Sequence, residues 1–306
     1  MLADHVEGNS NRTYLALWAL IMFYAAATIL PLFPGAVPFP IVVASEIIPA
    51  AIFALVHGAK LYRLRGIFVF AGLCLLIGNI LENIGVLTGF PFGRYYFTER
   101  MGPKLFQVPV LIGPAYLGVG YLSWVVARLI LGKAEDLFAG ARVVTVPIMA
   151  TFMMAAWDLA IDPTLSTIGH YWIWLKGGPY FGVPLVNFLG WYLTNYLIYQ
   201  SFALYLRSRP AIQTRVAPVY WRLAVLFYTV VAVGNVLRII PVSGPTTVID
   251  AAGVQWKVAD INAACALAAL FVMGAFAWLG WAKVADQEAS VGSPETPQTA
   301  KKTAAG

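Results

Sequence analysis

The sequence predicts an all-α membrane protein: a polytopic helical bundle of about eight transmembrane helices, with interfacial or re-entrant outer loops. Apolar residues (AVILMFWYC) make up 60% of the chain and charged residues 11%, and the mean hydropathy is +0.76. Soluble domains are about 45–50% apolar and about 25% charged. Apolar runs of membrane-spanning length also recur along the chain, separated by segments with Pro, Gly and charge. We therefore expect one integral membrane domain over residues 1–282, in a multi-pass protein of the cell membrane.

Eight apolar runs are long enough for a helix that crosses a bilayer, which takes about 20 residues. In chain order they are Tyr14–Phe33, Pro38–His57, Gly66–Thr88, Leu105–Leu131, Val143–Ile161, Val183–Leu206, Val219–Ile240 and Val258–Trp281. The remaining segment, residues 283–306, is rich in Pro, Ser, Thr, Ala and Lys, which is typical of a disordered tail. Cys74 and Cys265 both lie inside apolar runs, so we predict no disulfide framework.

Basic residues predict the orientation, because Lys and Arg concentrate in cytoplasmic loops. With eight spans, one side of the bundle carries fourteen of the 20 Lys and Arg residues and the other side carries six. An odd number of spans would spoil this asymmetry. Both termini, and with them the disordered tail, are therefore predicted to be cytoplasmic.

Two of the predicted outer connections are unusually aromatic and glycine-rich. They are Gly89–Lys104 (GFPFGRYYFTERMGPK) and Pro163–Gly182 (PTLSTIGHYWIWLKGGPYFG). Such segments suit two roles: anchoring at the membrane interface, where Trp and Tyr gather, or a re-entrant lid over a cavity. The sequence favours neither role over the other.

Five acidic residues lie within or at the edge of the apolar runs: Glu46, Glu82, Asp158, Asp162 and Asp260. Ionisable groups inside a membrane are costly and mark a functional site by default. In the predicted orientation, each acid belongs to the outer half of its helix. We therefore expect acids from separate helices to meet in one water-poor cavity near the non-cytoplasmic face.

Helical spacing places further polar groups beside these acids. Asp158 and Asp162 lie one turn apart (i, i+4), and Pro163 ends the predicted fifth helix. Shared helix faces are also predicted for Asn79, Glu82 and Asn83, for Asn187, Trp191 and Asn195, for Asn235 and Arg238, and for Lys257 and Asp260. Five of the eight helices can thus present polar groups to a single outward-facing cavity.

Each of these residues also has a purely structural interpretation. Ion pairing alone would account for Asp162 with a nearby base, for Glu82 with Arg94 or Arg238, and for Asp260 with Lys257 or Arg238. The asparagines would hold helices together, which is the favoured interpretation of Asn195. His57, at the cytoplasmic end of the second run, is expected to be interfacial. His170, in an aromatic outer connection, is a candidate supporting group of the site.

A dry cavity with paired carboxylates and aromatic rings suits carbocation chemistry. A buried carboxylic acid can hold a proton at neutral pH and protonate an alkene. The faces of Trp, Tyr and Phe rings then stabilise the cation, and an ionised second carboxylate acts as general base on the water that captures it. Asp158 and Asp162 could divide these roles. Proton-coupled transporters use the same residue types, so the spacing does not decide between them.

Two stretches of the chain resemble the membrane carotenoid-biosynthesis family. One is ENIGVLTGFPFGRY (Glu82–Tyr95), followed by Val108-Pro109; the other, Trp157–Trp191, contains WDLAIDP, HYWIW and GPYFGVPLVNFLGW. By motif the resemblance covers about residues 66–206. This family includes the cofactor-independent carotenoid 1,2-hydratases that act on γ-carotene or bisanhydrobacterioruberin. The resemblance implies addition of water to the terminal isoprenoid double bond of an acyclic (ψ) carotenoid end, which gives a tertiary alcohol.

Combining this resemblance with the buried acids gives a candidate site. Its catalytic residues are Asp158, Asp162 and Glu82, and its substrate-binding residues are Asn187, Trp157, Trp191, Phe92, Tyr95 and Asn83. One Asp would donate the proton, while the other Asp and Glu82 would position water. The resemblance implies no cofactor. The expected partners are a carotenoid, water, the lipid bilayer and other enzymes of the carotenoid pathway, but no nucleic acid.

Other classes of protein remain possible from the sequence. A UbiA-type prenyltransferase needs two aspartate-rich motifs for magnesium diphosphate, and only Asp158 and Asp162 resemble one. The three histidines and two cysteines show no HxxxH or CxxC spacing, so no metal site is predicted. A proton-coupled transporter or a pigment-binding protein is the non-enzyme alternative, although the internal repeats common in transporters are not evident. A retinal-type pigment needs a lysine within a helix, and Lys257 lies at the end of one.

Overall fold

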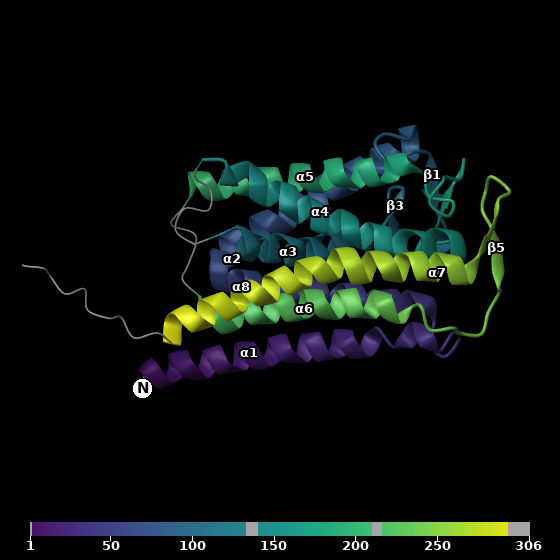
Figure 1. Ribbon diagram of the computed structural model, residues 1–306. Coiled ribbons are helices and arrows are strands. Elements are labelled where there is room, and N and C mark those ends of the chain that lie inside the picture. Colours follow the sequence, from purple (N-terminus) through teal and green to yellow (C-terminus); the bar gives the residue numbers. More distant parts are fainter. Residues whose placement is uncertain (1, 133–139, 210–215, 293–306) are drawn as a thin grey trace, which may run out of the picture.

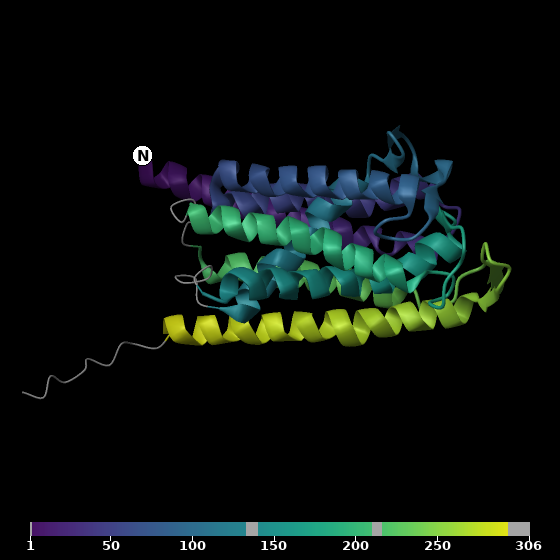
Figure 2. The same ribbon diagram turned by 90° about the horizontal axis from the view of Figure 1, so that it is seen from above.

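The computed structural model describes residues 2–132, 140–209 and 216–292. Long helices run side by side along one axis, with short strands gathered at one end (Figures 1 and 2). The helices are α1 (Leu2–Ala27), α2 (Phe39–Thr88), α3 (Ile112–Leu131), α4 (Arg142–Pro163), α5 (Leu185–Ser208), α6 (Pro218–Leu237), α7 (Val258–Leu267) and α8 (Gly274–Gly292). In this part of the chain, six helical segments are long and apolar enough to cross a membrane.

One of these segments, α2, contains two antiparallel helices. Its backbone leaves helical geometry at Arg63, where φ is 55° and ψ is 171°. The first half of α2 runs parallel to α3, because later residues of one contact later residues of the other (Ala50 with Gly118, His57 with Tyr121). The second half runs antiparallel to α3, because later residues of α2 contact earlier residues of α3 (Tyr62 with Arg128, Phe70 with Tyr121, Glu82 with Tyr116). The chain therefore reverses at Arg63, and both halves pack on α3.

The fold class predicted from the sequence, an all-α polytopic bundle, is confirmed. The six apolar segments contain seven helical spans, because α2 reverses and contributes two. The helix α5 runs alongside them and is the eighth span (Figure 1). α5 is not one of the six apolar segments, because tyrosines and polar residues interrupt its apolar run. The fourth span begins later than the predicted Leu105, because residues 104–109 form a hairpin of β2 (Lys104–Leu105) and β3 (Val108–Pro109).

The last helix is longer than the sequence suggested. α7 and α8 are joined by a stretch of wider π-helical turns, η5 (Ala268–Met273), and α8 continues to Gly292 instead of ending near Trp281. Ion pairs of Lys283 with Asp286 and of Arg222 with Glu288 stabilise this extension. The rest of the predicted tail, residues 293–306, lies outside the described residues.

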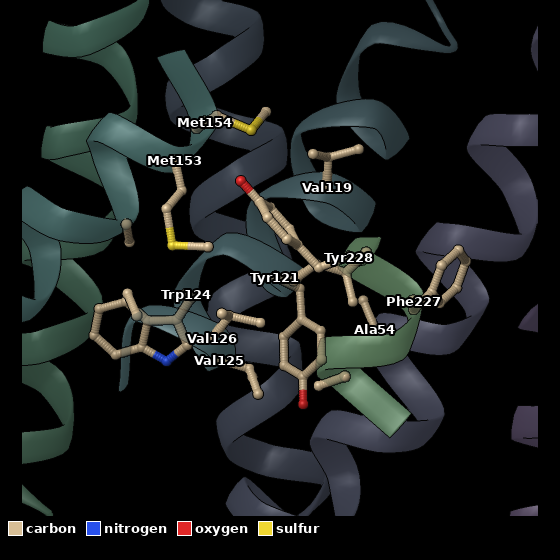
Figure 3. Packing of buried hydrophobic residues seen from close by; sticks show 14 of the residues in the cluster. Ala54, Val119, Tyr121, Trp124, Val125, Val126, Met153, Met154, Phe227 and Tyr228 are labelled. Carbon is tan, nitrogen blue, oxygen red and sulfur yellow. The ribbon is translucent and has the colours of Figure 1, made fainter. Parts of the chain in front are cut away.

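The core of the bundle is centred on α3, where every residue from Ala115 to Leu129 is buried. Figure 3 shows rings of Tyr121 and Trp124 packed against side chains of α4 and α6. The other helices expose apolar residues outward, as a surface in contact with lipid requires. His57 is fully buried in this core, with Nδ1 2.7 Å from Tyr121 Oη and Nε2 2.9 Å from the Tyr220 carbonyl oxygen. The interfacial position predicted for His57 is wrong, because the helix continues past it.

At one end of the bundle, the two aromatic connections pair with each other. β1 (Tyr95–Phe97) and β4 (Trp172–Trp174) form an antiparallel ribbon in which Tyr95 lies opposite Trp174. A second hairpin, β5 (Thr247–Ile249) with β6 (Gln255–Lys257), lies at the same end (Figure 1). Gly190 lets α5 approach the segment before β1, because a Cβ there would lie 2.8 Å from the Pro91 carbonyl oxygen. The aromatic ribbon is thus held against the ends of the helices.

Candidate active site

The end of α4 is shaped by Pro163. Proline has no N–H to donate to the carbonyl one turn earlier, and here the hydroxyl of Tyr180 donates to that oxygen, on Leu159, at 3.1 Å. The helix then widens into π-helical turns, η3 (Thr164–Ile168), and Ser166 Oγ donates to the Asp162 carbonyl oxygen at 2.8 Å. Single wide turns of this kind are frequent at functional sites. Here η3 follows the last two turns of α4, which carry Asp158 and Asp162.

Asp158 and Asp162 are bridged by one side chain of α5. The Asn187 amide nitrogen donates to Asp158 Oδ2 at 3.1 Å and to Asp162 Oδ2 at 2.6 Å. All three residues are about 1% exposed. The predicted convergence of the fifth and sixth helices on one buried site is therefore what the structure shows. The amide carbonyl oxygen, Asn187 Oδ1, is buried and has no partner among the described residues.

Two indole groups from β4 complete the surroundings of Asp162. Trp172 Nε1 donates to Asp162 Oδ1 at 2.9 Å, and Trp174 Nε1 donates to the same oxygen at 3.3 Å. Sequence reasoning missed both tryptophans, although HYWIW was recognised as a motif. The signal was present, because alternate residues of a strand point to the same side. The Asp162 carboxyl group accepts three hydrogen bonds in all, an environment that stabilises a carboxylate.

Glu82 joins these acids from the end of α2. Its Oε2 accepts a hydrogen bond from the Tyr95 hydroxyl, and its Oε1 accepts one from Tyr116 at 2.8 Å. Burial and the adjacent Glu82 carboxylate raise the pKa of Tyr95 well above its ordinary value, so this hydroxyl keeps its proton and donates it. Tyr116, on α3, was not predicted. The suggested pairing of Glu82 with Arg94 or Arg238 is replaced by two tyrosine hydroxyls.

No Lys or Arg in the described part of the chain forms an ion pair with Glu82, Asp158 or Asp162. Three buried acids without a cation cannot all carry charge at low cost, because like charges in a medium of low polarity repel strongly. Such a cluster is expected to retain at least one proton at neutral pH. It is therefore suited to proton transfer.

Two cavities are lined by residues of this cluster. The larger, about 430 Å³, has a mainly apolar lining that includes Asp158, Trp157 and Trp191. It opens beside the exposed side chains of Phe33 and Val242. The smaller, about 30 Å³, is lined by ten residues, namely Glu82, Phe92, Tyr95, Phe97, Ile112, Asp162, Trp172, Trp174, Asn187 and Trp191. We call them the apolar cavity and the polar chamber.

Aromatic rings form the wall between the two cavities. Trp191 lines both of them and is stacked on Tyr116, with ring centroids 4.8 Å apart and an interplanar angle of 11°. Trp157 meets Trp191 edge to face at 5.9 Å and lines the apolar cavity. The face of an indole ring attracts positive charge, so these rings can stabilise a cation formed beside Asp158.

The remaining predicted residues fall into two groups. Phe92 is 1% exposed and lines the polar chamber, as expected of a site residue. Asn83 instead lies away from both cavities: its amide nitrogen donates to Asn79, and its oxygen accepts from the backbone of Gln107 at 3.0 Å. Its position supports a loop and offers nothing to a substrate in either cavity.

Other acids and polar residues singled out in the sequence lie apart from the cluster. Asp260 is exposed. Glu46 pairs with Arg238 at 3.4 Å in another part of the apolar cavity. Asn195 donates to the Trp191 backbone oxygen, consistent with its structural interpretation. Within residues 2–132, 140–209 and 216–292, no group of three or more His, Cys, Asp or Glu side chains is arranged to hold a metal ion.

Comparison with known proteins gives one similar relative and one family. The chain is 32% identical over 120 residues to a bisanhydrobacterioruberin hydratase of Haloarcula japonica, a match that covers 38% of this chain and 37% of that protein. The chain thus spans little more than a third of the relative's length. No solved structure matches it. The family model described as carotenoid biosynthesis protein matches residues 40–252, which include Glu82, Asp158, Asp162, both aromatic connections and Asn187. That match covers more than half of the chain, which therefore belongs to the carotenoid biosynthesis protein family.

Proposed function

We propose that the protein is a carotenoid hydratase that adds water to the terminal isoprenoid double bond of an acyclic carotenoid end. One observation carries the proposal: Asp158 lines the apolar cavity, Asp162 and Glu82 line the polar chamber, and Asn187 bridges the two aspartates. Asp158 can thus contact an apolar substrate in the apolar cavity, and Asp162 and Glu82 can contact water in the polar chamber. Family membership and the hydratase named among the relatives support this assignment.

Asp158 is the proton donor in this mechanism. It accepts a hydrogen bond from Asn187 and otherwise faces an apolar cavity, surroundings in which the neutral acid is favoured over the anion. The terminal double bond, when placed beside it, accepts the proton at its CH carbon. The O–H bond of Asp158 breaks, a C–H bond forms, and the positive charge is left on the carbon that carries two methyl groups.

Capture of this tertiary cation by water completes the addition. The ring faces of Trp157 and Trp191 hold the cation, and a water molecule from the polar chamber forms the C–O bond. Asp162, stabilised as a carboxylate by its three donors, takes the proton that this water loses. The proton then returns from Asp162 to Asp158, so the net reaction consumes one water and gives a tertiary alcohol.

The polar chamber suits a reactant water. Its volume of about 30 Å³ leaves room for about two water molecules by the usual measure. Glu82, oriented by Tyr95 and Tyr116, offers an acceptor to such a water. The unpartnered Asn187 Oδ1 offers another. Glu82 and Asn187 therefore position the nucleophile while Asp162 removes its proton.

Expression in cells that accumulate an acyclic-ended carotene tests the proposal. Extracted pigments should include a product heavier by one water, and Asp158→Asn should abolish it while leaving the protein in the membrane. Asp260→Asn, which removes an exposed acid, serves as the matched control and should keep the product. Failure to form hydrated product from any ψ-ended carotene, with the protein folded, would overturn the assignment.

A further inference from the structure

A second polar group lies in the wall of the apolar cavity, apart from the carboxylate cluster. Glu46, in the first half of α2, and Arg238, directly after α6, both line this cavity. They form one ion pair, between Arg238 Nη2 and Glu46 Oε2, at 3.4 Å. The side chain of Glu46 is 19% exposed and that of Arg238 is 15% exposed. A charged pair in a mainly apolar cavity is costly to bury and requires an explanation.

The Arg238 guanidinium leaves a donor unused. Its Nε–H is buried and has no partner among the described residues. A buried donor without an acceptor costs free energy that a ligand oxygen could recover. The neighbouring amide of Asn235 already donates to the Val231 backbone oxygen at 3.0 Å. Glu46 and Arg238, which both line the apolar cavity, therefore leave one buried donor unsatisfied beside a carboxylate acceptor.

We propose that Glu46 and Arg238 form a hydroxyl-binding subsite for an alcohol group on the isoprenoid that enters the cavity. A hydroxyl oxygen accepts the Arg238 Nε–H, and its own hydrogen is donated to Glu46, so one group satisfies both partners. A hydrocarbon would leave the donor unpaired, and sites built to bind a hydroxyl discriminate strongly against analogues without one. The preferred ligand is therefore an oxygenated isoprenoid.

The position of the subsite adds a second condition. Arg238 and Asp158 line one cavity of about 430 Å³, so the hydroxyl and the reacting double bond belong to the same end of the molecule. This condition rests on the proposed function, whereas hydroxyl binding at Glu46 and Arg238 does not. A purely structural pair, which would only tie α2 to α6, predicts no difference between alcohol and hydrocarbon ligands.

Thermal unfolding of the purified protein with two small probes tests the subsite. Linalool and myrcene share the terminal isoprenoid double bond, and only linalool carries a hydroxyl. Because ligands that bind the folded state raise Tm, the concentrations that give half of the maximal shift can be compared. In the unmodified protein linalool should act at a concentration about tenfold lower than myrcene, the value of a hydrogen bond to a charged group.

Arg238→Lys keeps the cation for Glu46 but removes the Nε–H, and should bring the ratio close to one. Arg222→Lys is the matched control, because Arg222 lies on α6 and pairs with Glu288 outside the cavity; its ratio should remain near tenfold. Equal potency of the probes in the unmodified protein, no shift with either probe, or an unchanged ratio in Arg238→Lys would each overturn the subsite. A preference for linalool without hydration of any carotene would keep the subsite and reject the hydratase.

Discussion

Asp158 and Asp162 lie one turn apart on α4, yet they face different cavities. Asp158 borders the apolar cavity and Asp162 borders the polar chamber. The same Asn187 amide nitrogen joins them, at 3.1 Å and 2.6 Å. Asp158 can therefore donate a proton in the apolar cavity, and Asp162 can accept one in the polar chamber.

Replacement of the bridging amide is expected to impair catalysis. Asn187→Leu has similar volume but removes the donor shared by Asp158 and Asp162, so neither carboxyl group is held toward its cavity. Loss of hydrogen bonds to charged groups predicts a fall in hydrated product on the order of 10-fold to 100-fold at equal protein level. Asn195→Leu, on the same helix, removes an amide bound to the Trp191 backbone and serves as the control. Equal losses in both variants would point to packing instead.

The indole groups that donate to Asp162 are expected to support its role as a base. Trp174→Phe keeps an aromatic ring beside Tyr95, whose ring centroid lies 4.8 Å away, but removes the N–H. Turnover should fall about tenfold, the effect of one hydrogen bond to a charged acceptor. Trp256→Phe loses the equivalent N–H to Asp250, in the hairpin of β5 and β6, and should retain activity. Unchanged turnover in Trp174→Phe would remove Asp162 from the mechanism as described.

The orientation of the bundle remains a prediction from its basic residues. The described ends of the chain lie at one end of the bundle and the strands at the other (Figure 2). In a protein lacking Cys74 and Cys265, a membrane-impermeant maleimide added to intact cells should label Ser243→Cys, near the strands. Ala141→Cys, before α4, should react only after lysis. The opposite pattern would place the acids at the cytoplasmic side.

Much of the bundle could be predicted because a membrane imposes a simple rule on sequence. Each crossing requires a long apolar run, and buried acids stand out within such runs. Asp158, Asp162 and Asn187 were found in this way, since their spacing along α4 and α5 fixes a common side. The error at His57 has the same origin. An apolar run ends where polar residues begin, whereas the helix continues to Arg63 and keeps His57 inside the core.

The donors to these acids could not be predicted, because they depend on packing between distant segments. Trp174 reaches Asp162 only because β4 pairs with β1, a register that neither segment specifies alone. Tyr116 lies in a helix that is buried on all sides, so its apolar pattern does not indicate which side meets Glu82. Asn83 shares a helix face with polar neighbours, but its side-chain oxygen accepts a hydrogen bond from the backbone N–H of Gln107, in the hairpin of β2 and β3.

The hydroxyl of Tyr180 is expected to stabilise the end of α4. It donates to the Leu159 carbonyl oxygen, which Pro163 leaves without its helical partner, at 3.1 Å. Tyr180→Phe keeps the ring packed on Phe188 but leaves this oxygen unsatisfied, which should lower the free energy of unfolding by about 1–3 kcal/mol. Thermal unfolding in detergent measures the change.

A second substitution makes this prediction specific. Pro163→Ala restores a backbone N–H one turn after Leu159, so it should recover much of the Tm lost in Tyr180→Phe, an interaction that a double-mutant cycle detects. Tyr196→Phe, which removes a hydroxyl bound to Gln200 on α5, is the control and should show no such coupling to Pro163→Ala. If the two changes at Tyr180 and Pro163 were additive, the hydroxyl would not be replacing the missing N–H, and the positions of Asp158 and Asp162 would need another support.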